Sequence, residues 1–206
     1  TFLDRELLYR EAIERSGASS LDTLDDLFQA LESLTKRRLH EGSRLTIIGA
    51  GDGLEALAAD HLYAINQGNI DFQVLKQPEW FASSEVFPVD DDTLSFLKKD
   101  ADGFLIPIVA ETLLEQETHY IDMWAKRFAL FEEKLSRPVY FAIPGMVFGR
   151  LLRDAMDLVG LATYTTPEQA LNGFLSLVRH THATRLVDAR VEDADFDTLL
   201  PAERFL

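Results

Sequence analysis

The feature that most constrains this chain is the alternation of short apolar segments of strand length with longer segments of helical period. Three of the short segments are continuous apolar runs, which is typical of parallel strands buried on both faces. Strands that alternate with helices of ten or more residues indicate a parallel sheet with helices on both sides. We therefore predict a doubly wound α/β chain with about five strands. The expected strands are 44–48, 70–75, 103–109, 138–143 and 161–164, and the helices that follow them are 54–66, 115–135, 147–159 and 167–180.

Two amphipathic helices are expected before the first strand. One covers residues 2–15, and Gly17 can end it. The other begins near Leu24, where Asp22 or Thr23 can cap it. The apolar positions of this second helix mark one face and are Leu24, Leu27, Phe28, Leu31 and Leu34.

Two segments and one proline depart from the regular pattern of strands and helices. Segment 76–93 is rich in Pro, Ser and Asp and is expected to be irregular. Pro107 is unfavourable in the centre of the third strand, because proline lacks an N–H group for the sheet. The tail 188–206 is acidic, and we expect it to be extended.

Composition excludes several classes of function. The chain has 206 residues, with 20 Lys and Arg against 35 Asp and Glu, and its net charge is −15. Such a charge argues against a nucleic acid or an anionic membrane as partner. The absence of cysteine excludes disulfides, thiolate metal sites and cysteine nucleophiles. No signal peptide is visible, and no apolar run approaches the roughly 18 residues of a membrane span, so we expect a cytoplasmic protein.

The histidines do not form a pattern that predicts a metal site. A metal site needs a convergent set of ligands, and the histidine spacing indicates none. We therefore expect surface or helix-end roles for His40, His61, His119, His180 and His182.

The strongest local chemical signal is Gly49-Ala50-Gly51-Asp52-Gly53, between the first strand and the following helix. Glycines let the backbone approach a ligand, and free N–H groups at a helix N-terminus attract anions. In a doubly wound sheet, ligands bind at the carboxyl ends of the strands. We therefore expect these five residues to form a phosphate or ligand loop.

The loop alone leaves several interpretations open. Its glycines fit a dinucleotide fingerprint loosely, but Lys76 stands where the ribose-binding acid is expected. They also fit a SAM-dependent methyltransferase-like fold, although Ile47 and Ile48 replace its first acid. A phosphate or CoA-type site is a third interpretation. The fourth is a tight strand-to-helix turn in which Asp52 caps the helix.

Longer stretches of the sequence resemble a known family. The chain from about residue 4 to 185 resembles the second flavodoxin-like ligase domain of NDP-forming acyl-CoA synthetases, which are related to succinyl-CoA synthetase. The same module occurs in multidomain protein-lysine acetyltransferases. The resemblance implies a flavodoxin-like fold. It is carried, in order, by segments 9–17, 21–30, 57–60, 137–139 and 160–170, the last reading Gly-Leu-Ala-Thr-Tyr-Thr-Thr-Pro-Glu-Gln-Ala.

The resemblance also implies a mechanism. In active members, acyl-CoA, phosphate and NDP interconvert with acid, CoA and NTP through a phosphorylated histidine on a preceding domain. Two helix N-termini cradle that group, and the matching helix here begins near Gly53. The implied cofactors of a full-length parent are CoA and ATP or ADP with Mg²⁺. The implied partners are neighbouring CoA-binding or ligase domains and ATP-grasp domains of the same or a partner chain, with a homo-oligomer as a further arrangement.

On this basis we expect three parts. Residues 1–40 would be a helical segment leading in from an upstream domain, residues 41–187 the flavodoxin-like CoA-ligase domain, and residues 188–206 an acidic tail or linker. Two motifs depart from the family. Its Asn-x-Gly-Gly stretch becomes Ala50-Gly51-Asp52-Gly53, and its Asn-Pro-apolar-Asp stretch is at best Phe87-Pro88-Val89-Asp90.

A carboxylate at position 52 would repel a phosphate. We therefore expect a degenerate ligase module that is inactive in isolation. The alternatives are a non-catalytic regulatory or scaffolding domain of an acetyltransferase, and a methyltransferase-like fold.

Overall fold

The computed structural model describes residues 2–36, 42–50, 53–65, 70–76, 90–111 and 120–193. The chain divides into two compact units. One comprises Thr1–Leu21 with Arg179–Leu206, and the other comprises Asp22–Val178. The larger unit contains the sheet and the predicted ligand loop. The predicted domain boundaries after residues 40 and 187 stay a prediction.

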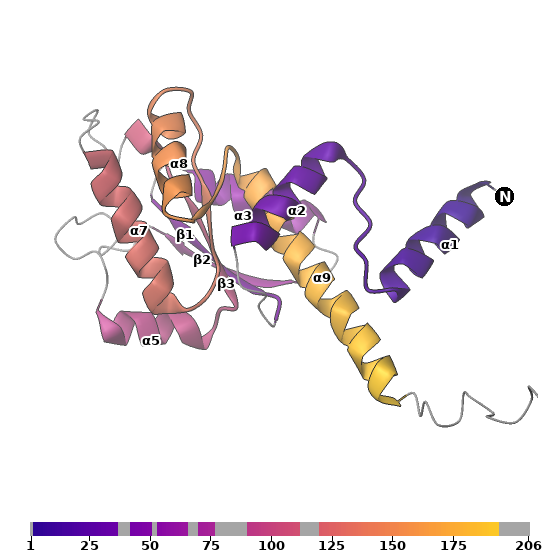
Figure 1. The fold of residues 1–206 in the computed structure, drawn as a ribbon. Coiled ribbons are helices and arrows are strands. Elements are labelled where there is room, and N and C mark those ends of the chain that lie inside the picture. The colour runs from indigo at the N-terminus through magenta and orange to yellow at the C-terminus, as the bar shows by residue number, and fades with distance from the viewer. Residues whose placement is uncertain are drawn as a thin grey trace, which may run out of the picture. The chain divides into compact units, whose positions relative to one another are not determined.

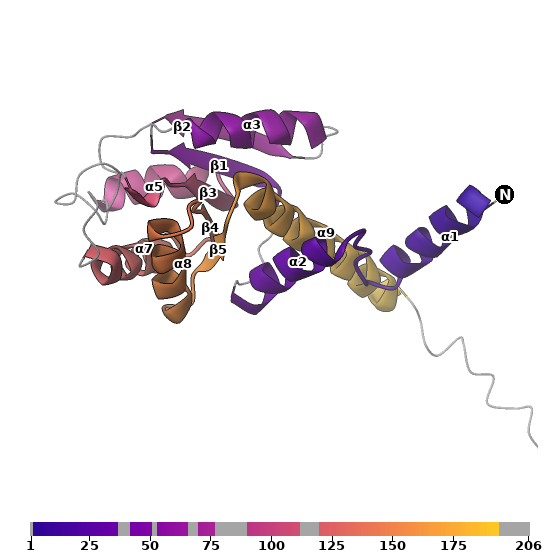
Figure 2. The same ribbon diagram turned by 90° about the horizontal axis from the view of Figure 1, so that it is seen from above.

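The larger unit is built on a five-stranded sheet in the order β2-β1-β3-β4-β5, and every paired neighbour is parallel (Figures 1 and 2). This order is that of flavodoxin-like folds, so the predicted fold class is confirmed. The direction of winding reverses between β1 and β3, which makes their carboxyl ends the switch point of the sheet. The strands are β1 Arg44–Gly49, β2 Asp71–Lys76, β3 Gly103–Pro107, β4 Val139–Ala142 and β5 Ala162–Tyr164.

Helices cover both faces of the sheet (Figure 2). On one face lie α3, Leu54–Ile65, and the first part of α9, Pro167–Asp193. On the other lie α5, Asp91–Lys99, α7, Ile121–Leu135, and α8, Phe148–Leu158.

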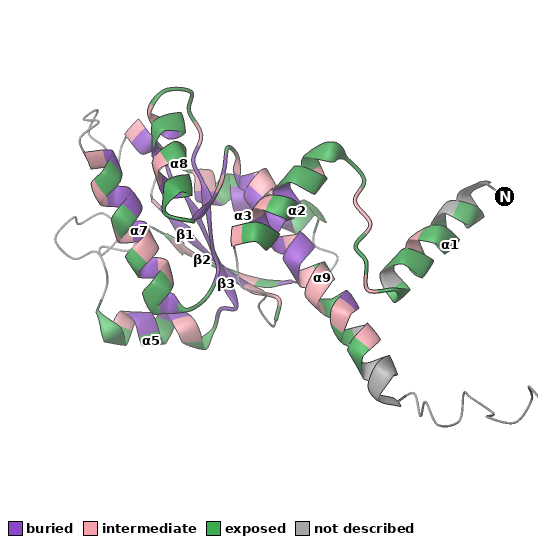
Figure 3. Ribbon diagram, viewed as in Figure 1, coloured by how far each residue is buried: buried purple, intermediate pink, exposed green. Residues whose placement is uncertain are grey.

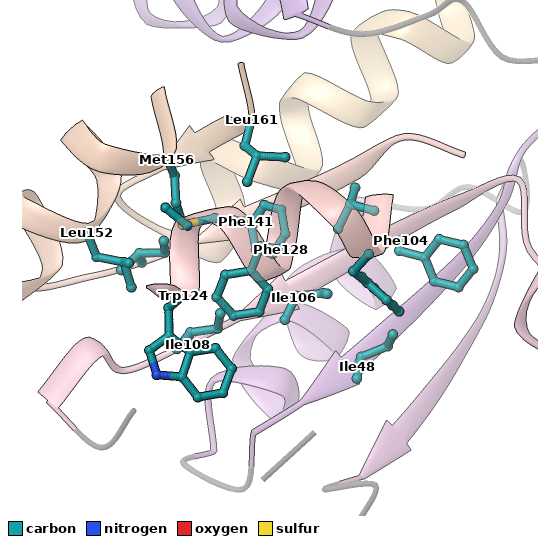
Figure 4. Packing of buried hydrophobic residues seen from close by; sticks show 14 of the residues in the cluster. Ile48, Phe104, Ile106, Ile108, Trp124, Phe128, Phe141, Leu152, Met156 and Leu161 are labelled. Atoms are coloured by element: carbon teal, nitrogen blue, oxygen red, sulfur yellow. The ribbon is translucent and has the colours of Figure 1, made fainter. Parts of the chain in front are cut away.

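Successive strand residues point to opposite faces of the sheet and pack into two separate hydrophobic cores, one on each face. In β1, Ile47 packs with α3 and α9, whereas Ile48 packs with the helices of the opposite face. The core between the sheet and helices α5, α7 and α8 is rich in aromatic rings. Phe128 of α7 lies 5.5 Å from Trp124 and 4.9 Å from Phe141, measured between ring centroids (Figure 4). The strands are buried almost throughout, apart from β2 (Figure 3).

Helix α2, Leu24–Lys36, begins with reciprocal hydrogen bonds. The Asp26 backbone N–H donates to Thr23 Oγ1 at 3.0 Å, and the Thr23 backbone N–H donates to Asp26 Oδ2 at 3.2 Å. Of the two predicted caps, Thr23 is therefore the one that acts. The apolar face predicted for this helix is exposed; for example, Phe28 is 65% exposed. The buried positions are the small or polar Gln29, Ala30 and Ser33.

The smaller unit contains α1, Phe2–Arg15, and the C-terminal part of α9. Gly17 follows α1 with a φ of +82°, and the Ala18 N–H donates to the Ile13 carbonyl, so the predicted end of this helix is confirmed. Two predictions for the C-terminus are wrong within the described part. Helix α9 does not end at His180, and residues 188–193 are helical rather than extended. The reason is that no Gly or Pro occurs between Gly173 and Asp193 to stop the helix.

Helix α5 was not predicted. Asp90 caps it by accepting a hydrogen bond from the Thr93 N–H at 2.9 Å, and Leu94 and Leu97 are buried. The prediction of irregular structure is therefore wrong for residues 91–93 and for Lys76, which ends β2, while 77–89 lie outside the described residues. Pro107 is the last residue of β3 rather than its centre, where proline costs little.

Candidate functional site

The predicted ligand loop lies at the switch point between β1 and β3. The structure describes three of its five residues: Gly49 ends β1, Ala50 follows, and Gly53 precedes α3. Gly51 and Asp52 lie outside the described residues, so the predicted role of Asp52 stays a prediction. Gly49, Ala50 and Gly53 thus lie at the edge where doubly wound folds bind ligands.

Gly53 begins α3 in a conformation that favours glycine. Its φ is +86°, and its carbonyl accepts hydrogen bonds from the N–H groups of Ala56 at 3.1 Å and Leu57 at 3.4 Å. A Cβ at this position would meet nothing within 4 Å, so backbone conformation rather than space selects glycine. The turn places the positive end of the α3 dipole at the carboxyl edge of the sheet.

A carboxylate already occupies this region. Glu55 is the second residue of α3 and is 8% exposed. Its side chain lies against Gly49: a Cβ on Gly49 would be 2.7 Å from both Cγ and Cδ of Glu55. Within the described residues, Glu55 Oε2 is buried and has no hydrogen-bond partner. Only glycine at position 49 leaves room for this arrangement.

Glu55 was missed by sequence reasoning. An acid in the first turn of a helix is ordinary, because it interacts favourably with the dipole and usually lies in solvent. The one sequence signal for the position of Glu55 was a glycine, Gly49, at the end of the preceding strand, where a missing side chain leaves room for a neighbour. The burial of Glu55 depends on how α3 packs on β1, which local sequence does not state.

Glu55 places an acidic side chain at the positive end of the α3 dipole. A buried carboxylate in the first turn offsets the partial positive charge of the helix end and repels a second negative group.

The end of β4 presents a cation beside the same edge of the sheet. Arg153 of α8 donates from Nη1 to the carbonyls of Ile143 and, at 3.4 Å, Gly145. Burial lowers the pKa of the Arg153 guanidinium. Gly145 has a φ of +103°, and a Cβ there would lie 3.2 Å from Glu111 Oε1. Arg153 thus holds the turn after β4 in place.

The histidines show no metal site in the part of the chain that is described. No group of three or more His, Asp or Glu residues there is placed to hold a metal ion. His61 lies on α3, and its Nε2 atom is buried without a hydrogen-bond partner among the described residues. Burial would raise the pKa of Glu168, but hydrogen bonding to Thr166 and the charge of His61 hold that pKa below its usual range. His40 and His119 lie outside the described residues, and His180 and His182 are on α9 in the smaller unit.

Comparison with solved structures identifies proteins that share this fold. The chain is similar to dinucleotide forming acetyl-coenzyme A synthetase 1 of Ca. Korarchaeum cryptofilum, both in its apo form and in its complex with phosphate and ADP. Each comparison gives a TM-score of 0.63 at 20% identity and covers 89% of this chain and 43% of the other. It is also similar to PH0766 from Pyrococcus horikoshii OT3, with a TM-score of 0.64 at 16% identity over 85% of this chain and 44% of that one.

The chain therefore spans less than half the length of the structures it matches. No protein-family model and no curated protein matches the sequence. The structural likeness agrees with the resemblance to acyl-CoA synthetases seen in the sequence, and at this identity it shows a common fold. No helix among the described residues is long and apolar enough to cross a membrane.

Proposed function

We propose that this chain is a ligase-like module of an acyl-CoA synthetase-like protein of the NDP-forming type. The module is degenerate, in the sense that it does not itself hold the phosphoryl group. It supplies the carboxyl edge of its sheet, with the N-terminus of α3, to a neighbouring CoA-binding or ATP-grasp domain. CoA and ATP or ADP with Mg²⁺ bind to the other domains of that assembly, and the isolated chain is inactive.

The observation that carries this proposal is the shared fold. Nearly the whole chain matches less than half of an acetyl-CoA synthetase chain, so the fold serves there as one part of a larger protein. The glycine loop at the switch point agrees with a site at this edge. The buried Glu55 supports degeneracy, because it stands where a phosphoryl group would need positive potential.

A second candidate function is a non-catalytic regulatory or scaffolding domain of a multidomain protein-lysine acetyltransferase. Glu55 favours this candidate as well, since scaffolding needs no phosphoryl site. The methyltransferase-like interpretation has less support: β2 ends in the exposed Lys76, which offers no carboxylate to a ribose.

The test compares the isolated chain with the natural polypeptide or complex that contains it. ADP release from ATP is measured with and without CoA and a short-chain acid. We expect no release by the isolated chain, and release that needs both CoA and acid by the assembly. Acetyl transfer from acetyl-CoA to a lysine peptide, without ADP release, supports the second candidate instead. Turnover by the isolated chain contradicts the proposal, as does an assembly with neither activity.

A further inference from the structure

We propose that Glu55 is the residue that excludes a phosphoryl group from the N-terminus of α3, because its buried carboxylate lies in the first turn of that helix. The inference rests on the proposed function, since it names the side chain that makes the module degenerate. It does not depend on Asp52, which lies outside the described residues.

Position is the first step. Glu55 is the second residue of α3, within the turn where the helix dipole acts, and Gly53 sets the direction of that turn with its φ of +86°. The turn follows β1 at the switch point with β3. An anion bound by this helix end would meet the Glu55 carboxylate within the same turn.

Confinement is the second step. Cβ, Cγ and Cδ of Glu55 all approach Gly49, at 2.9, 2.7 and 2.7 Å from the position that a Cβ on Gly49 would take. The residue is 8% exposed, so the carboxylate is held against the end of β1 instead of extending into solvent. An incoming phosphate therefore cannot displace it without opening the contact between α3 and β1.

The unpartnered oxygen is the third step. Buried polar atoms in folded proteins are nearly always hydrogen-bonded, and Oε2 of Glu55 has no partner among the described residues. A carboxylate at this position interacts favourably with the helix dipole. Oε2 thus has no donor among the described residues that would offset its repulsion of a second anion.

The experiment measures thermal unfolding of the whole chain against phosphate concentration, with chloride keeping the ionic strength constant. The variant is Glu55→Gln, which keeps the size of the side chain and removes its charge. The matched control is Asp60→Asn, which removes one charge from an exposed position on the same helix. Removing a like charge within one helical turn should raise phosphate affinity by about tenfold or more. We expect saturable stabilisation of Glu55→Gln by phosphate, and no such effect on the parent or the control.

Three results would overturn the inference. They are equal stabilisation of the parent and Glu55→Gln, no response of either protein, and an equal gain in Asp60→Asn. Should Glu55→Gln fail to fold, Glu55→Ala provides the same comparison by calorimetric titration with phosphate, with the same outcomes.

The inference and the proposed function fail separately. A gain of phosphate affinity in Glu55→Gln, together with an assembly that shows no reaction of CoA or acid, retains the inference and rejects the function. An active assembly whose Glu55→Gln module gains no phosphate affinity rejects the inference alone.

Discussion

Ser33 Oγ of α2 lies 2.6 Å from the hydroxyl of Tyr164 in β5, and both side chains are buried. The Thr163 N–H of the same strand donates to Glu32 Oε1 at 3.4 Å. Helix α2 therefore closes the outer edge of β5, whose backbone groups would otherwise face solvent unpaired. Gly173 of α9 makes room for the Ser33–Tyr164 contact.

Gly173→Ala should destabilise the protein, although alanine normally stabilises a helix relative to glycine. The new Cβ would lie 2.5 Å from Ser33 Oγ and 2.6 Å from the Tyr164 hydroxyl, so one of them must move. We expect a loss of about 1–3 kcal/mol in the free energy of unfolding, measured with urea. Adding Ser33→Ala should recover part of the loss. If Gly173→Ala were as stable as the parent, the Ser33 and Tyr164 side chains would be able to move apart from the new Cβ without a loss of stability.

The ion pair between Arg44 and Asp102 should make stability depend on pH. Arg44 donates to Asp102 from its backbone N, Nε and Nη2 at 3.0, 3.1 and 2.8 Å. Burial would raise the pKa of Asp102, but these hydrogen bonds and the charge of Arg44 lower it below its ordinary 3.8. Because the pKa is lower in the folded state, the stabilisation is complete above about pH 4 and is lost as pH falls through the folded pKa.

Asp102→Asn tests this pair. We expect it to cost about 2 kcal/mol at pH 7, and the difference from the parent to shrink below pH 4. Urea unfolding at several pH values provides the measurement, with the exposed neighbour Asp100→Asn as control. A difference that stays constant from pH 7 to pH 3 would contradict the assignment.

Gly49 and Glu55 should be energetically coupled. Gly49→Ala places a Cβ 2.7 Å from Glu55 Cδ and should cost about 1–3 kcal/mol. In a Glu55→Ala background the same change should cost less, giving a coupling energy of about 1–2 kcal/mol in a double-mutant cycle. Additive costs would mean that Glu55 moves aside without penalty.

The exposed and buried faces of α2 should differ in how much a polar substitution destabilises the protein. Phe28 is 65% exposed, so Phe28→Ser should change the free energy of unfolding by less than about 0.5 kcal/mol. Ala30 is 5% exposed, and Ala30→Asp buries a charge and should cost about 3 kcal/mol or more. Urea unfolding measures both, and a large cost for Phe28→Ser would show that its ring is covered in solution.

Much of this fold could be predicted because its strands are buried on both faces. Runs such as Leu45-Thr46-Ile47-Ile48 have no other stable place, and the observed strands begin and end within about two residues of those expected. The length of α9 could not be predicted, because an acidic segment without Gly or Pro is compatible with either helix or coil.

The sequence predicted the glycine positions of the candidate site but not the side chain that lies against them. The glycines located the edge of the sheet, whereas the position of Glu55 depends on the contact between α3 and Gly49. Helix α5 was missed for a similar reason: its capping residue Asp90 belongs to a stretch whose composition indicates irregular structure.

Because α2 covers the outer side of β5, the two edges of the sheet differ in whether a further strand can pair with them. Among the described elements, β5 has its outer side covered by Glu32 and Ser33, while the outer side of β2 is hydrogen-bonded to no strand. Among the described strands, β2 is therefore the edge strand beside which an additional strand could pair. In the part of the chain that is described, α2, the helix that precedes the first strand, therefore blocks the pairing of a further strand with β5, which is the contact through which exposed edge strands aggregate.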